Sequence, residues 1–131
     1  MPHFVVTYVH RDPVGWARHL DAHLTWLVER VESGELRASG PTTGTETRGA
    51  GWERTALLVF AADDEEALRA VVDTDPYLVE GQVQEMTVTR WDPIFGVFAE
   101  ESSRAGVGDA ELFERLAEVA RQDPAGPGGT R

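Results

Sequence analysis

The sequence has 131 residues, which is enough for one domain with a substantial hydrophobic core but not for two. Hydrophobic residues make up 41% and charged residues 27%, as in ordinary globular proteins, and cysteine is absent. The lack of cysteine excludes a disulfide framework and a thiolate metal site. All 12 basic residues are arginines and the net charge is −11, so we expect neither nucleic acid nor a membrane surface as a partner.

The first residues lack the basic segment and apolar run of a signal peptide, and no apolar run approaches the roughly 20 residues that span a bilayer. We therefore expect a cytoplasmic protein. A small anionic substrate stays open, because one local arginine can outweigh a diffuse negative charge.

The first half of the chain predicts a strand, a helix and a second, short strand. Residues His3 to His10 alternate as a strand does. Asp12 is a suitable N-cap before Pro13, and Gly34 can end the helix in the left-handed conformation. Arg37 to Ser39 then reads as a short strand closed by Gly40-Pro41. Between the helix ends, apolar residues recur at helical spacing: Trp16, Leu20, Leu24, Leu27 and Val31.

The second half predicts two more strands and two helices. A Thr- and Gly-rich loop from Thr42 to Gly51 leads to a strand at Thr55 to Ala61. A helix capped by Asp63 or Asp64 follows and is ended by Asp75-Pro76. The last elements are a strand at Val83 to Trp91 and a helix that Asp109 can cap. The last helix has Leu112, Phe113, Leu116, Val119 and Ala120 on one side.

This order predicts an α+β fold, the ferredoxin-like β-α-β-β-α-β arrangement with an extra C-terminal helix. We expect a domain at 1–98, a linker and amphipathic helix at 99–123, and a disordered Pro/Gly-rich tail at 124–131. The third strand is apolar on both faces, whereas the helices of this fold cover only one face of the sheet. A second copy that packs sheet to sheet would cover the other face, so we expect a homodimer.

Four histidines are candidates for chemistry. His3 and His10 lie at the ends of the first strand, and we interpret both as surface or strand-end residues. His19 and His23 lie one turn apart, as metal ligands can, but the zincin glutamate and a third ligand on that helix are missing. We therefore expect no metal site and no cofactor.

His23 falls inside the apolar stripe, where its ring needs a hydrogen-bond partner. The structural explanation is a core histidine satisfied by a backbone carbonyl. The functional one is a general base held by a carboxylate. Asp75 is a plausible carboxylate because Pro76 keeps it outside the helix, although Asp-Pro turns commonly end helices. The residues by themselves leave both explanations open.

Several short motifs occur together: His23-Leu24-x-x-Leu27, Gly34-Glu35-Leu36, Ser39-Gly40-Pro41, Asp75-Pro76-Tyr77 and Gly81. In this order and spacing, from Phe4 to Phe98, the chain resembles the YciI-like (YCII-related) family. The resemblance implies a dimeric α+β barrel with a His-Asp pair in a pocket. By position the catalytic residues would be His23, Asp75 and Tyr77, and the substrate-binding residues His19, Ser39, Gly40 and Pro41.

The chain departs from the family pattern at one point. Many relatives have an arginine shortly before the histidine of the first helix, where this chain has Leu20, Asp21 and Ala22. Arg18 and His19 are the nearest substitutes, so the residue that would bind an anion stays unassigned.

Two function classes follow from these observations. The first is an isomerase- or lyase-like enzyme that uses His23 and Asp75 for acid-base chemistry on a small cyclic or enolisable metabolite, with Tyr77 donating to a developing oxyanion. The second is a non-catalytic module that binds a small ligand. An oxygenase-like or haem-handling protein ranks last, because no porphyrin-binding signature is evident.

Overall fold

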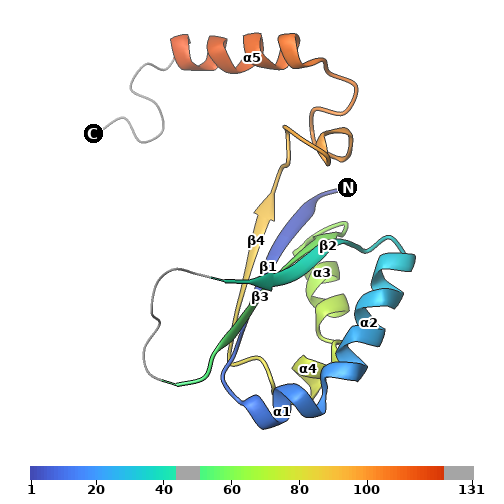
Figure 1. Cartoon of the computed structure of the whole chain (residues 1–131). Coiled ribbons are helices and arrows are strands. Elements are labelled where there is room, and N and C mark those ends of the chain that lie inside the picture. Colours follow the sequence, from blue (N-terminus) through green and yellow to red (C-terminus); the bar gives the residue numbers. More distant parts are fainter. Residues whose placement is uncertain (44–50, 123–131) are drawn as a thin grey trace. The chain divides into compact units, whose positions relative to one another are not determined.

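Four strands form one antiparallel sheet in the order β2-β3-β1-β4, and four helices lie on one of its faces (Figure 1). The strands are β1 (His3–His10), β2 (Leu36–Thr42), β3 (Arg54–Ala61) and β4 (Glu85–Trp91). The helices are α1 (Pro13–Arg18), α2 (Leu20–Glu32), α3 (Glu65–Val72) and α4 (Pro76–Val79). The element order and the central position of β1 and β3 confirm the ferredoxin-like α+β prediction.

The computed structural model describes residues 1–43 and 51–122, and the chain divides into two units at 1–92 and 93–131. The second unit contains the short helix η1 (Ala99–Glu101) and α5 (Asp109–Gln122). In α5, Leu112 is buried, whereas Phe113, Leu116 and Val119 are exposed. The tail predicted at 124–131 and most of the loop predicted at 42–51 lie outside the described residues. No helix among the described residues is long and apolar enough to cross a membrane.

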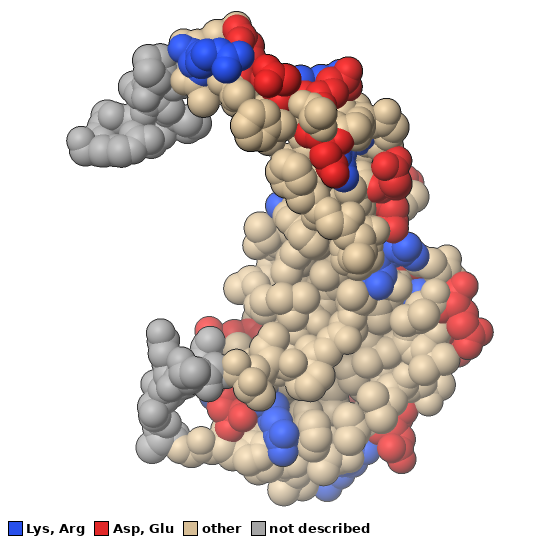
Figure 2. Space-filling view, turned by 45° about the horizontal axis from the view of Figure 1, so that its top comes forward, with Lys and Arg blue, Asp and Glu red and all other residues tan. Residues whose placement is uncertain are grey.

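The core of the first unit lies between the sheet and the helices. The side chains of β1 that face the helices, Phe4, Val6 and Tyr8, are each at most 1% exposed, as the period of two along a strand requires. They belong to a cluster with residues of α2, β2, β3 and α3: Trp26, Leu36, Leu58, Phe60, Leu68 and Val72. On the face drawn in Figure 2, charged side chains lie mostly toward the margins of this unit and uncharged residues cover most of its middle.

The predicted first helix is broken into two. Asp12 caps α1 and Gly34 has φ +85 beyond α2, as expected, but the chain bends at His19, where φ is −101 and ψ is 5. The His19 amide donates to the Gly15 carbonyl and the His19 carbonyl accepts from His23, so the bend leaves neither backbone group unpaired. The bend therefore turns α2 to a new direction while both backbone groups of His19 stay paired.

Two other boundaries differ from the prediction. β2 runs through Gly40 and Pro41 instead of ending before them; a proline is tolerated there because β2 is an edge strand. Asp75-Pro76 was expected to end a helix, but α3 ends at Val72 and this dipeptide begins α4. Proline suits the first position of a helix as well as the position after one.

Candidate active site

Asp75 is held in place by the local structure that begins α4. Its backbone is extended (φ −61, ψ 126), and its Oδ1 accepts a hydrogen bond from the Tyr77 amide at 2.9 Å, as an N-cap does. Pro76 fills the first helical position. Unlike an ordinary N-cap, the carboxylate is fully buried.

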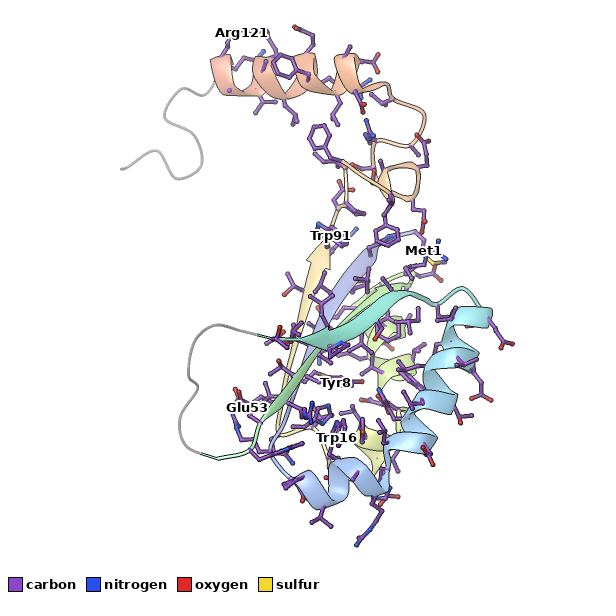
Figure 3. All side chains as sticks on the ribbon, in the orientation of Figure 1. Met1, Tyr8, Trp16, Glu53, Trp91 and Arg121 are labelled. Carbon is purple, nitrogen blue, oxygen red and sulfur yellow. The ribbon has the colours of Figure 1, made fainter. Side chains whose placement is uncertain are left out.

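Two side chains complete the environment of the Asp75 carboxylate. Nδ1 of His23 lies 2.9 Å from both carboxylate oxygens, and the Tyr8 hydroxyl donates to Oδ2 at 2.8 Å. Tyr8, labelled in Figure 3, lies between the sheet and the helices. The predicted proximity of His23 and Asp75 is therefore confirmed. These bonds compensate the burial of a carboxylate, which would be costly without partners.

Burial and the nearby carboxylate also affect the two tyrosines. Burial first, and the negative charge of Asp75 second, raise the pKa of Tyr77 to about 12. The same two causes, in the same order, raise the pKa of Tyr8 well above its ordinary value. Both phenols therefore stay protonated at neutral pH and can act as hydrogen-bond donors.

The orientation of His23 leaves one ring nitrogen available. A carboxylate only accepts hydrogen bonds, so Nδ1 of His23 bears the proton and Nε2 has the free lone pair. The His23 ring stacks on the Tyr77 ring with centroids 4.3 Å apart and an interplanar angle of 28°. His23 is 8% exposed and lines a cavity. This arrangement suits proton exchange between Nε2 and a molecule in the cavity.

The cavity has a volume of about 560 Å³, which is in the range of small-molecule sites. Leu27 packs against the core, but all five residues of the apolar stripe predicted from the sequence line this cavity: Trp16, Leu20, Leu24, Leu27 and Val31. The residues that α2 buries most are His23 and Trp26, and Nε1 of Trp26 donates to Oγ1 of Thr74 at 2.8 Å. Leu24 and Val31 stay 46% and 56% exposed, so the stripe is apolar surface that a ligand can cover.

His3 and His10 were interpreted as surface or strand-end residues; both lie at the ends of β1, but neither is at the surface. His3 is 1% and His10 3% exposed. His10 faces the helices and lines the cavity, and its Nδ1 donates to the Gln82 carbonyl at 2.7 Å. A Cβ at Gly15 would lie 2.0 Å from the end of the Gln82 side chain, so Gly15 leaves room for that side chain beside α1.

His10 is therefore a functional candidate that the sequence interpretation missed. Burial lowers the pKa of His10, with the Gln82 hydrogen bond acting in the opposite direction. Its ring lies 4.7 Å from the Tyr77 ring, so His10 and His23 both contact Tyr77. The missed signal was its position: residues 4, 6, 8 and 10 share one face of a strand, and the first three are apolar or aromatic.

Of the other predicted site residues, some line the cavity and one does not. Ser39, Gly40 and Pro41 all line the cavity from β2. His19 is half-buried at the junction of α1 and α2 and is not part of the lining. The Tyr77 hydroxyl donates to the Trp16 carbonyl at 2.8 Å, so donation to an oxyanion would have to replace that bond. The roles predicted for these residues stay predictions.

His23 turns to Asp75, and the described residues contain no group of three or more histidine, cysteine, aspartate or glutamate side chains that could hold a metal ion. One cation does line the cavity: Arg54, at the start of β3. No motif marks Arg54 in the sequence, where the family pattern points to the first helix for this charge.

Comparison with solved structures places the fold among ferredoxin-like proteins. The 5-chloro-2-hydroxyhydroquinone dehydrochlorinase TftG from Burkholderia phenoliruptrix AC1100, in complex with 2,5-dihydroxybenzoquinone, is 22% identical, with a TM-score of 0.54 over 68% of this chain and 92% of its own. Rv0793 from Mycobacterium tuberculosis is 14% identical, with a TM-score of 0.46 over 74% and 99%. A dimeric ferredoxin-like protein of unknown function from Jannaschia sp. CCS1 is 12% identical, with a TM-score of 0.45 over 70% and 99%.

The match in sequence is to a family and not to an individual protein. No curated protein matches the chain. The model of the YCII-related domain matches residues 4–92, which include β2, β3, β4, all of β1 except His3, and both His23 and Asp75. The chain therefore belongs to the YCII-related family.

Proposed function

We propose that this protein is an enzyme of the isomerase or lyase class that performs acid-base chemistry on a small cyclic or enolisable metabolite. The supporting observation is the buried His23–Asp75 pair, whose free imidazole nitrogen belongs to a residue that lines the cavity. His23 is the general base, and Asp75 is the residue that fixes its tautomer and stabilises its charged form.

The chemistry follows from the two nitrogens of His23. Nε2 takes a proton from a carbon beside a carbonyl group, and the electron pair of the broken C–H bond forms a C=C bond as the carbonyl oxygen becomes an enolate. The imidazolium so formed stays hydrogen-bonded to the Asp75 carboxylate. Return of the proton to another carbon gives an isomerisation, whereas departure of a group from the adjacent carbon gives an elimination.

The cavity favours a flat, largely apolar substrate. Its walls include the exposed stripe of α2, and its polar groups gather where His10, His23 and Tyr77 meet. TftG is known in complex with 2,5-dihydroxybenzoquinone, a flat hydroxylated ring, and our first candidate class is the broader one of flat rings that carry polar or acidic substituents. The cytoplasmic location expected from the sequence stays a prediction.

Hydrogen exchange tests this proposal even while the substrate is unidentified. A panel of 2-hydroxybenzoquinones, cyclic 1,3-diketones and butenolides is incubated with the protein in D₂O, and exchange or isomerisation at each carbon is followed by proton NMR. We expect catalysed exchange for at least one member, its loss in His23→Ala and His23→Gln, and severe impairment in Asp75→Asn. Arg69→Gln on α3 is the control, because Arg69 does not line the cavity and has no predicted role in the site.

Ligand binding without exchange in the wild-type protein would contradict the enzyme proposal. It would favour a non-catalytic binding module, which the size and apolar lining of the cavity also suit.

We further propose that the protein is a homodimer whose subunits pack sheet to sheet. The sheet face opposite the helices presents the half-buried side chains of Val5, Val9 and Leu57. No described element of the first unit covers this face (Figure 1). Sedimentation at micromolar concentration should give a dimer, and Leu57→Glu should give a folded monomer. A monomeric wild-type protein would refute the proposal.

A further inference from the structure

Arg54 is the cationic side chain that lines the cavity. It lies at the start of β3, directly opposite His10 in the antiparallel register with β1, so the two side chains emerge as neighbours on the helix-facing side of the sheet. Because His10 is kept neutral by burial, Arg54 supplies a positive charge at this end of the cavity.

Aromatic rings hold the Arg54 guanidinium. Its Cζ lies 5.1 Å from the ring centroid of Trp16 and 5.8 Å from that of Trp52, both within the range of cation–π contacts. Within residues 1–43 and 51–122, no carboxylate forms an ion pair with Arg54. Both rings contact the guanidinium, and no hydrogen bond to another described residue occupies its N–H donors, which can therefore bind a carboxylate from solution.

The other residues of the lining define what else the ligand must be. One acid, Glu32, belongs to the lining, and most of the remaining wall is apolar or aromatic. Trp16 itself lines the cavity beside Arg54 and offers a flat surface against which a ring can stack.

We propose that Arg54, held by Trp16 and Trp52, is the anion-binding residue of this site, and that its ligand is a small planar carboxylate. The carboxylate accepts from the Arg54 fork, and the ring lies along the apolar wall toward His23. This inference rests on the proposed function, because it names the substrate class of the same cavity. It also assigns to β3 the positive charge that the sequence led us to seek on the first helix.

A matched pair of probes tests the assignment. Binding of benzoate and of benzamide, which have the same shape and differ in charge, is measured by titration calorimetry at pH 7.5. A charge-assisted pair at a half-open site should favour benzoate by roughly tenfold. We expect Arg54→Gln to abolish this preference and leave benzamide affinity unchanged, Arg54→Lys to keep part of it, and Arg69→Gln on α3, whose guanidinium pairs with Glu65, to keep all of it.

Three results would overturn the proposal: no saturable millimolar binding of benzoate, equal affinity for the two probes in wild type, or an unchanged preference in Arg54→Gln. If Arg54 only holds the two indoles, Arg54→Gln should lower the melting temperature without changing the preference. The measurement needs no turnover, so it is separable from the proposed chemistry. His23→Ala should keep the benzoate preference even if no substrate is ever turned over.

Discussion

Replacement of Asp75 by alanine should destabilise the protein by about 3–5 kcal/mol. The substitution leaves three buried donors without their acceptor: Nδ1 of His23, the hydroxyl of Tyr8 and the amide of Tyr77. A buried donor without a partner costs about 1–3 kcal/mol, so three could cost up to about 9 kcal/mol. Loss of the desolvation cost of the carboxylate, and entry of water, offset part of that sum.

Asp12→Ala is the matched control. Asp12 also caps a helix in front of a proline, and its Oδ1 accepts from the Gly15 amide at 3.1 Å, but its side chain is exposed. The loss of such a cap costs about 1 kcal/mol. Asp75→Asn should fall between the two, because an amide can still accept from Tyr77 and can donate to the Tyr8 oxygen.

Urea unfolding followed by circular dichroism gives the three free energies, provided that the m-values agree. If Asp75→Ala cost no more than Asp12→Ala, the carboxylate would not be the acceptor of the three donors. The described geometry of the site would then be wrong, and the assignment of His23 as a base with it.

Three further predictions follow. Since burial lowers the pKa of His10, its contribution to stability is complete above about pH 6.5 and is lost as the pH falls below that value. His10→Asn should therefore reduce the acid dependence of the melting temperature. An unchanged slope of melting temperature against pH would count against a buried neutral His10. Since the pKa of Tyr77 is raised to about 12, its contribution to stability is complete below about pH 10 and is lost between about pH 10 and 12. Tyr77→Phe should flatten the fall of the melting temperature in that window. An identical fall in the variant would contradict the raised pKa. Deletion of the residues after Ser102 should weaken the dimer, because α5 exposes an apolar stripe that a second copy can cover; an unchanged dissociation constant would make α5 dispensable.

The fold could be predicted because it depends on local patterns. Alternation in the strands, the Asp12 cap and Gly34 are each visible within a few residues of sequence. The bend at His19 was not predictable in this way, because both of its backbone groups stay paired and no helix-breaking residue marks it. The direction of α2, and so the exposure of its stripe, depends on that bend.

The site was only partly predictable, because contacts between residues far apart in the chain leave no local signal. His23 and Asp75 were identified individually, one by its place in an apolar stripe and the other by the proline after it, and the family motif related them. His10 could have been identified because it shares one face of β1 with Phe4, Val6 and Tyr8. Its position at the end of the strand favoured a structural interpretation instead. Arg54 had no such signal, because its position over Trp16 joins residues that are far apart in the chain.

The Asp-Pro dipeptide shows how one local structure supports two roles in this chain. Asp12-Pro13 and Asp75-Pro76 each begin a helix, and in each the carboxylate accepts from a backbone amide of the first turn. Asp12 is exposed and needs no other partner, whereas Asp75 lies under α2 and against β1, where His23 and Tyr8 reach it. Helix capping alone is enough to fix the position of the Asp75 carboxylate. Asp75 is therefore a candidate catalytic partner because α2 and β1 pack over it. The same Asp-Pro turn at the surface would only cap a helix.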